Sequence, residues 1–211
     1  MTQLILALDV TEKKDAVSIA SLCAPYIDAI KVGYPLVLSS GLMIADDLDQ
    51  LDLPLIADFK VADIPNTNRL IAGQVFSSGF DAIICHGFPG RDSAGACIET
   101  AHEYGGECYL VAEMSHPGAT EFFHGGVAEE ITRLAVDCDA DGIIAPATRP
   151  ERVAQLKGLA GDRKIYSPGV GAQGGEIEKI ATIVDGIIVG RSIYESADPA
   201  GAARQYDWIR R

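Results

Sequence analysis

The strongest constraint on the fold is a regular alternation of short apolar runs and longer amphipathic stretches along the whole chain. The apolar runs are rich in leucine or β-branched residues and are nearly continuous. Strands of this composition are typical of a parallel sheet that is buried on both faces. We therefore predict strands over Leu4–Leu8, Ala29–Val32, Leu55–Ala57, Ala82–Cys85, Cys108–Ala112, Gly142–Ala145, Lys164–Tyr166 and Gly186–Val189.

The stretches between these runs have the residue spacing of helices that bury one face. Thr11 and Pro65 are start signals of the kind found at helix N-termini. We predict helices over Asp15–Ala24, Pro35–Leu48, Asn66–Ser77, Ser93–Glu103, Val127–Val136, Arg149–Leu159, Gly175–Ile183 and Ala200–Ile209.

About eight strand–helix units in strict alternation indicate a single (β/α)₈ TIM barrel of the α/β class. A doubly wound open sheet is the alternative, but polar residues follow nearly every run and not only one switch point. With 211 residues, the chain is near the lower end of length for this barrel. No linker, low-complexity tract or second domain interrupts the pattern, so we expect residues 1–211 to form one domain.

The composition excludes several classes of protein. Hydrophobic residues make up 48% of the chain, which is enough for a full core and argues against disorder. The formal net charge is −13. This charge argues against nucleic acid or an anionic membrane surface as the main partner, because both attract positively charged proteins. No apolar run approaches the ~18 residues of a transmembrane helix, and no signal peptide is recognised. The five cysteines lack C-x-x-C spacing and are expected to be reduced and mostly buried, as in a cytoplasmic protein.

Charged side chains follow or end several of the apolar runs. Asp9 follows the first run, Lys31 lies in the second, and Asp58 and Lys60 follow the third. In a barrel of this kind, the residues at the C-terminal ends of the strands face the active site. A charge in such a place is costly unless it is paired or used, so we select these four residues as candidates.

The segment Asp58-Phe59-Lys60-Val61-Ala62-Asp63 is the strongest local feature. Positions two apart in a strand share a face, so Asp58 and Lys60 are expected to point the same way, with Asp63 returning toward Lys60 from the next turn. Carboxylates around an ammonium favour its charged form, so we expect Lys60 to be a proton donor and a fixed positive charge, not a Schiff-base nucleophile. The alternative is an ion-pair network that only holds the loops of the barrel rim.

Two glycine-containing loops are candidates for phosphate binding. Ser167-Pro168-Gly169-Val170-Gly171-Ala172-Gln173-Gly174-Gly175 follows the seventh run, and Gly190-Arg191-Ser192 follows the eighth. The loops after strands 7 and 8 are the usual phosphate site of this barrel. Glycine lets backbone N–H groups approach an anion, and arginine can donate two parallel hydrogen bonds to a phosphate. The alternative is a pair of turns with a surface arginine.

Other polar residues give weaker signals. His86, His116 and His124 lack metal-ligand spacing with a second histidine or a carboxylate, so no metal is expected. Glu113 follows the fifth run and could serve as a ligand or base, but it has no evident partner in the sequence. Ser115 lacks the G-x-S-x-G context of a hydrolase nucleophile.

These motifs, in this order, resemble those of a known family. The Asp58-x-Lys60-x-x-Asp63 element is followed by Ile64-Pro65-Asn66-Thr67. Met114-Ser115-His116-Pro117-Gly118, the loop after the seventh run and Val189-Gly190-Arg191-Ser192-Ile193-Tyr194 complete the match. The combination looks like orotidine 5′-monophosphate decarboxylase of the short archaeal type, over nearly the whole chain and without departure at a motif position.

The resemblance implies a cofactor-free decarboxylase that converts orotidine 5′-monophosphate to uridine 5′-monophosphate in the last step of de novo pyrimidine synthesis. It implies catalytic roles for Lys60, Asp58, Asp63 and Lys31, with Lys60 protonating the C6 carbanion. It also implies a homodimer in which each subunit completes its neighbour's site. The implied substrate contacts are Asp9 and Lys31 at the ribose, Ser115 at the pyrimidine, Gln173, Arg191 and the Gly190 backbone at the phosphate, Pro168 and Val170 in the closing loop, and Asp63, Ile64 and Thr67 from the neighbouring subunit.

Two other functions remain open on the sequence alone. Sugar-phosphate decarboxylases or aldolases of the same suprafamily share the Asp-x-Lys-x-x-Asp element and resemble Mg²⁺ enzymes with an acidic ligand at the end of the second strand. Lys31 stands at that place here and would repel Mg²⁺. The second alternative is a non-catalytic nucleotide-binding barrel, because a fold does not fix a function.

Overall fold

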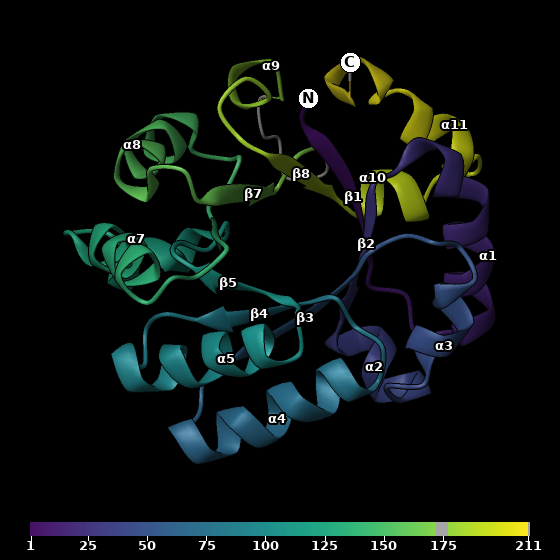
Figure 1. The fold of residues 1–211 in the computed structure, drawn as a ribbon. Helices are drawn as coiled ribbons and strands as arrows, with labels where there is room; N and C mark the ends of the chain where they lie inside the picture. The colour runs from purple at the N-terminus through teal and green to yellow at the C-terminus, as the bar shows by residue number, and fades with distance from the viewer. Residues whose placement is uncertain (172–176, 211) are drawn as a thin grey trace.

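The fold is a closed barrel of parallel strands, described by a computed structural model for residues 1–171 and 177–210. Each strand pairs with the next along the sequence, and β8 pairs again with β1 (Figure 1). This topology confirms the predicted TIM barrel. The strands are β1 (Gln3–Leu8), β2 (Ala29–Gly33), β3 (Leu55–Val61), β4 (Ala82–His86), β5 (Glu107–Val111), β6 (Gly142–Ile144), β7 (Lys164–Pro168) and β8 (Gly186–Val189).

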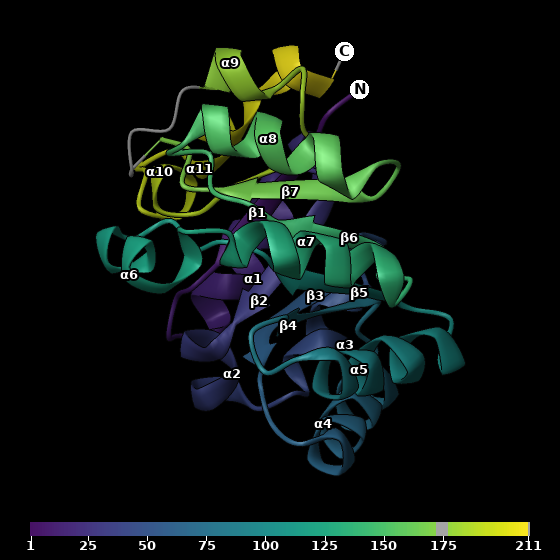
Figure 2. The ribbon, with the colours of Figure 1, turned by 90° about the vertical axis from the view of Figure 1, so that its left-hand side faces the viewer.

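Helices surround the barrel on its outside (Figures 1 and 2). No helix in the described ranges has the length and apolar character needed to cross a membrane. The helices are α1 (Lys13–Cys23), α2 (Tyr34–Ser40), α3 (Ile44–Asp49), α4 (Pro65–Ser77), α5 (Arg91–Glu103), α6 (Thr120–Phe123), α7 (Val127–Asp137), α8 (Pro150–Ala160), α9 (Ile177–Ile180), α10 (Arg191–Tyr194) and α11 (Pro199–Arg204), with 3₁₀ turns at Ala24–Tyr26, Pro117–Ala119 and Asp207–Arg210.

Several helix boundaries differ from the prediction. The expected helix Pro35–Leu48 is divided into α2 and α3, because Gly41 lies between them at φ 74°, a conformation that ends a helix. The expected helix Ala200–Ile209 is likewise α11 followed by a 3₁₀ turn. The short helices α6 and α10 were not predicted. The expected helix Gly175–Ile183 lies partly outside the described residues, and its described part contains α9.

The core has two parts, one between the strands and the helices and one inside the barrel. All five cysteines are free thiols; four are buried and Cys138 is partly exposed, as expected from the sequence. The inner part is formed by every second residue of the strands, the period that a pleated strand imposes. Its members are Ile5, Ala7, Ala29, Ile56, Ala82, Ile84, Tyr109, Val111, Ile144, Tyr166 and Ile188.

Two stacked tyrosines fill the end of the barrel where the strands begin. The rings of Tyr109 and Tyr166 lie 4.5 Å apart between their centroids. Each ring packs over a glycine of the next strand: a Cβ at Gly142 would lie 2.7 Å from the Tyr109 ring, and one at Gly186 would lie 2.8 Å from the Tyr166 ring. The glycines therefore make room for the tyrosines, which close this end of the barrel.

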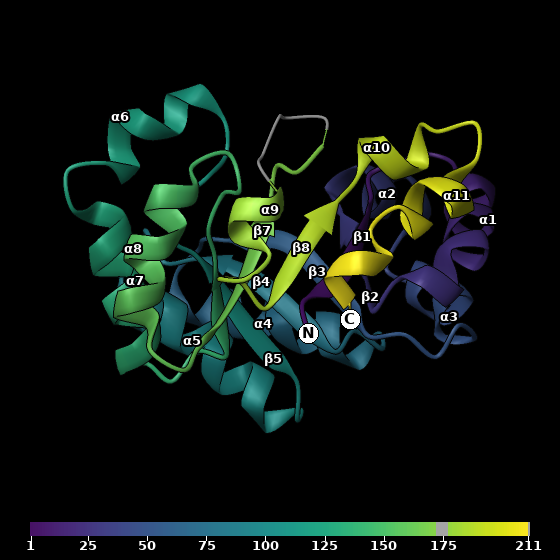
Figure 3. The ribbon, with the colours of Figure 1, turned by 90° about the horizontal axis from the view of Figure 1, so that it is seen from above.

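The other end of the barrel carries the loops that follow the strands. Figure 3 shows β8 leading up to α10 at this rim, whereas both chain termini lie on the opposite side. The termini are joined by a hydrogen bond in which the Thr2 N–H donates to the Ile209 carbonyl at 3.1 Å. Any site built from strand-end side chains must therefore open at the rim that bears α10.

Candidate active site

A cavity of about 290 Å³ lies at the C-terminal ends of the strands. Its size is close to the lower limit of ~300 Å³ for small-molecule sites. The residues singled out from the sequence that line it are Asp9, Lys31, Asp58, Lys60, Glu113, Ser115, Pro168, Val170, Gly190 and Arg191. Residues from opposite ends of the sequence thus meet in one place.

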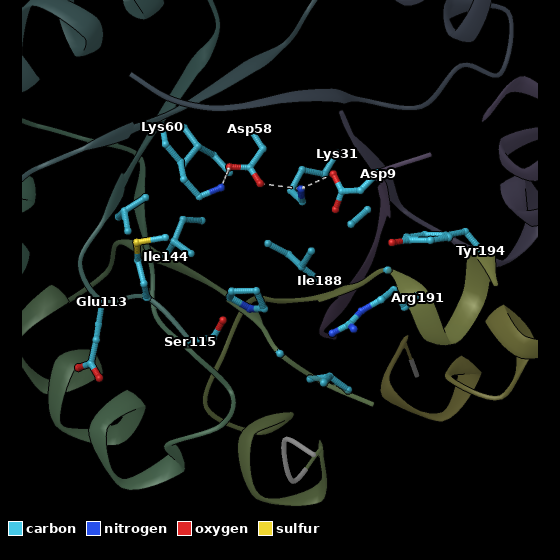
Figure 4. A pocket seen from close by; sticks show the side chains of 18 residues that line it. Asp9, Lys31, Asp58, Lys60, Glu113, Ser115, Ile144, Ile188, Arg191 and Tyr194 are labelled. Carbon is cyan, nitrogen blue, oxygen red and sulfur yellow. Dashed lines mark hydrogen bonds and ion pairs between the residues drawn. The ribbon is translucent and has the colours of Figure 1, made fainter. Parts of the chain in front are cut away.

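Four charged side chains form a row along one side of the cavity (Figure 4). The Lys31 ammonium lies 2.6 Å from Asp58 Oδ2 and 3.9 Å from Asp9 Oδ1. The Lys60 ammonium lies 2.5 Å from Asp58 Oδ1. Asp58 therefore bridges two ammonium groups, and the charges alternate in sign along the row.

The neighbours of Asp58 and Lys31 keep both groups charged. Burial alone raises the pKa of Asp58, but Lys31 and Lys60 outweigh this effect by charge and hydrogen bonding, and the pKa is lowered from its ordinary value of 3.8. Burial alone lowers the pKa of Lys31, but Asp58 and Asp9 raise it above its ordinary value of 10.5. Asp58 and Lys31 are therefore fixed charges at neutral pH.

Lys60 has an unusual backbone conformation for a residue in a strand. Its φ is 46°, in the left-handed region that L-residues rarely adopt, and the pairing of β3 with β4 shifts register between Ala57 and Val61. Regular alternation is therefore not what directs Lys60 toward Asp58, although the two side chains do meet as expected. Backbone strain of this kind concentrates at functional sites, where it directs a particular side chain.

Asp63 does not approach Lys60 within the same chain. Its carboxylate accepts a hydrogen bond from the Ile64 N–H at 2.7 Å, and no ion pair to Lys60 is found in residues 1–171 and 177–210. The backbone of Asp63 is held by Asn68 and Ser93: its N–H donates to Asn68 Oδ1 at 3.0 Å, and its carbonyl accepts from the Ser93 hydroxyl at 2.7 Å. Asp63, Ile64 and Thr67 are absent from the lining of this chain's cavity.

Arg191 and Tyr194 lie at one end of the charged row (Figure 4). Arg191 is exposed, and within the described part of the chain its guanidinium has no carboxylate partner. Burial, then Asp9 and Glu195, raise the pKa of Tyr194, so its phenol keeps its proton and can donate a hydrogen bond. Gln173 lies outside the described residues, so its place in the site is not described.

The comparison with protein families gives a match over nearly the whole chain. The model of the orotidine 5′-phosphate decarboxylase / HUMPS family matches residues 2–206. The chain belongs to this family.

Individual members of the family are similar over nearly their whole length. The orotidine 5′-phosphate decarboxylase of Methanosarcina mazei is 55% identical over 204 residues, which are 96% of this chain and 92% of the relative. The one of Thermococcus kodakarensis is 51% identical, over 97% of this chain and 94% of the relative. A crystal structure of the Methanocaldococcus jannaschii enzyme, complexed with the inhibitor BMP, matches with a TM-score of 0.95 and 45% identity, covering 99% of this chain and 98% of that one.

Three features of this family member were not predicted from its sequence. Tyr194 lines the cavity, but α10, which carries it, was not expected. The apolar floor includes Ile144 and Ile188, which the alternation within the strands would have indicated. The partners of Glu113 were also not predicted: its carboxylate binds Arg149 and Arg152, which lie 36 and 39 positions later in the sequence.

Proposed function

We propose that the chain decarboxylates orotidine 5′-monophosphate to uridine 5′-monophosphate (UMP), the last step of de novo pyrimidine synthesis, without a cofactor. The observation that carries the proposal is the row Asp9–Lys31–Asp58–Lys60 beside an apolar floor, in a chain of the decarboxylase family. We take residues 1–211 to be one decarboxylase domain. The reduced, mostly buried cysteines support a cytoplasmic location.

In the proposed mechanism, Lys60 acts on C6 of the pyrimidine. The bond between C6 and the carboxylate breaks, carbon dioxide leaves, and the electron pair stays on C6 as a carbanion. The Lys60 ammonium stabilises this charge and then donates a proton to C6, which forms the C6–H bond of UMP; the amine regains a proton from water. Charge that is fixed before the reaction needs no reorganisation at the transition state, which favours this route.

Asp58 and Lys31 hold the reacting ammonium in place. Asp58 binds Lys60 and Lys31 at once, so neither ammonium can turn away without breaking an ion pair. The Lys31 ammonium also lies between the carboxylates of Asp9 and Asp58. This arrangement argues against the Mg²⁺-dependent sugar-phosphate alternative, because a divalent cation at these carboxylates would face the Lys31 ammonium.

The remaining cavity residues suit a nucleotide monophosphate. We assign Ser115 to the pyrimidine, and Asp9 and Lys31 to the ribose hydroxyls. We assign the phosphate to Arg191 and the Gly190 backbone, together with Gln173, with Pro168 and Val170 in the segment that closes over it. Tyr194 is a further hydrogen-bond donor beside Arg191.

We also propose a homodimer with shared active sites. Asp63 and Ile64 are exposed, and Ile64 leaves 65% of its surface exposed in the single chain. Asp63, Ile64 and Thr67 are therefore available to complete the cavity of the partner subunit.

The test of the proposed function is a spectrophotometric assay with orotidine 5′-monophosphate in excess EDTA. We expect rapid loss of the substrate's ultraviolet absorption and formation of one UMP per substrate. Absence of turnover by folded, dimeric protein would contradict the proposal. Tight nucleotide binding without turnover would favour a non-catalytic binder, and activity that needs added Mg²⁺ would favour the sugar-phosphate class.

Replacing Arg191 with alanine is expected to lower kcat/KM about 10- to 100-fold, the loss expected for a charge-assisted hydrogen bond to phosphate. Inhibition by UMP should weaken by a similar factor, whereas inhibition by uridine, which lacks the phosphate, should not change. The matched control is Arg69→Ala, which removes an exposed arginine that pairs with Glu99 on the outside of the barrel. Equal weakening for uridine and UMP would show that Arg191 does not bind the phosphate.

A further inference from the structure

A fully buried carboxylate lies next to the cavity but takes no part in the charged row. Glu113, two residues after the end of β5, has a side-chain exposure of 0%. Figure 4 shows its carboxylate directed away from Asp58 and Lys60. It accepts hydrogen bonds from Arg149 Nη1 at 2.9 Å and from Arg152 Nε at 3.1 Å, and His124 Nε2 lies 3.2 Å away. Burying a charge costs free energy, so a fully buried carboxylate with two arginine partners calls for an explanation that an exposed ion pair does not need.

Arg149 also binds the backbone on both sides of Ser115. Its Nη1 donates to the Met114 carbonyl at 2.8 Å, and its Nη2 donates to the His116 carbonyl at 3.1 Å. The planar guanidinium thus spans three residues of the loop between β5 and the turn at Pro117–Ala119. Only arginine presents donors in this fixed geometry.

Ser115 lies in the loop segment that depends on this support. It belongs to neither a strand nor a helix, and its side chain lines the cavity, with the hydroxyl directed toward the charged row (Figure 4). The two carbonyls bound by Arg149 belong to the Met114–Ser115 and His116–Pro117 peptides, so Arg149 holds the backbone on both sides of Ser115, and Glu113 holds the guanidinium. A site on a loop keeps its geometry only where a second layer of contacts holds it.

A second ion pair anchors the other side of the network. Arg152, one turn further along α8, binds Glu129 of α7 with its Nη1 at 2.5 Å from Oε1. The hydrogen bond to Glu129, against the effect of burial, raises the pKa of Arg152. Arg152 contacts Glu113 but neither loop carbonyl, so it offers a comparison residue within the same network.

We infer that Arg149, held by Glu113, is a positioning residue that fixes Ser115 for contact with the pyrimidine of the substrate. The inference rests on the proposed function, in which Ser115 binds the base. Arg149 itself touches the loop backbone and not the nucleotide. Its removal should displace the Ser115 hydroxyl and leave the phosphate and ribose contacts intact.

The test is a double-mutant cycle with Arg149→Met and Ser115→Ala. Arg149→Met is expected to lower kcat/KM about 10- to 100-fold, since a small misplacement of a binding group can have such an effect. In the Ser115→Ala background, the same change should cost less than about 2-fold, because the group that Arg149 positions is already gone. Equal losses in both backgrounds would overturn the inference, as would an unchanged kcat/KM in Arg149→Met.

Ligand binding provides a readout that a loss of general stability would not give. Arg149→Met should weaken UMP binding but leave the binding of ribose 5-phosphate, which has no base, within about 2-fold. Equal weakening of both ligands would overturn the inference. This comparison needs no turnover, so it still tests the positioning of Ser115 if the wild-type chain fails to decarboxylate orotidine 5′-monophosphate.

Two further variants separate positioning from folding. Arg149→Lys keeps a positive charge for Glu113, but one ammonium cannot replace the planar guanidinium that binds both carbonyls. The decrease in kcat/KM should therefore be smaller than in Arg149→Met, and it should also disappear in the Ser115→Ala background. Arg152→Met should lower the melting temperature, and its effect on kcat/KM should add to that of Ser115→Ala. If Arg149→Met does not fold, the cycle is run with Arg149→Lys, and additivity there would count against the inference.

Discussion

Replacement of Lys60 with alanine is expected to abolish decarboxylation while nucleotide binding survives. Lys60 is assigned both the stabilisation of the carbanion and its protonation. Each of these contributions is worth about 10²-fold or more, so their combined loss should lower kcat at least about 10⁴-fold. The dissociation constant of UMP, measured by titration, should change only a few-fold, because the contacts proposed for Ser115 with the base and for Arg191 with the phosphate do not involve Lys60.

The fold should tolerate this change. Lys60 is one-third exposed, at 36% of its side-chain surface, and Asp58 keeps its ion pair with Lys31 when Lys60 is removed. The melting temperature of Lys60→Ala should therefore stay close to that of the wild type. The control is Lys14→Ala, which removes an exposed lysine of α1 that does not line the cavity and should retain full activity. Near-normal turnover by folded Lys60→Ala would remove Lys60 from the mechanism.

The fold could be predicted because its signals are local. Buried parallel strands give short apolar runs, and the helices that cover them give amphipathic stretches, so both periods are visible in the sequence. The division of Pro35–Leu48 at Gly41 was missed, because a glycine within a helical pattern becomes a helix end only when its φ is positive. The four-residue α10 is too short for its periodicity to be recognised in a sequence.

The charged row could be predicted as a set of residues but not as a geometry. Strand ends meet at one rim of a barrel, so Asp9, Lys31, Asp58 and Lys60 could be grouped from their positions alone. The backbone conformation that directs Lys60 could not be predicted, because its positive φ departs from the regular alternation on which the prediction rested. Within the described part of its own chain, Lys60 pairs with one carboxylate, that of Asp58, instead of lying among several.

The contacts that hold the loop around Ser115 could not be predicted from the sequence for a different reason. Glu113 and Arg149 are 36 positions apart, and neither position carries a local signal of its partner. Their meeting follows from the neighbouring places of β5 and β6 in the barrel, with α8 following β6. Contacts of this kind depend on the closed topology and become visible only with the fold.

The proposed sharing of active sites across the homodimer leads to an expected result that a self-contained site would not give. Lys60→Ala and Asp63→Ala homodimers should both be nearly inactive, the second because each cavity loses a carboxylate supplied by its partner. In a hybrid dimer, one cavity combines the two defects, and the other combines an intact Lys60 with an intact Asp63. Since a two-fold dimer has two equivalent sites, the hybrid should regain about half of the wild-type activity per dimer.

The experiment uses the two variants with different affinity tags, co-expressed and purified in two steps so that only hybrid dimers remain. The matched control is the hybrid of Lys60→Ala with Asp58→Ala. Lys60 and Asp58 are paired within one chain at 2.5 Å, so each cavity of this hybrid keeps one defect and no activity should return. Recovery with Asp63→Ala but not with Asp58→Ala requires that Asp63 act across the interface. A Lys60→Ala/Asp63→Ala hybrid as inactive as its parents, or a fully active Asp63→Ala homodimer, would mean that Asp63 does not complete the partner's site.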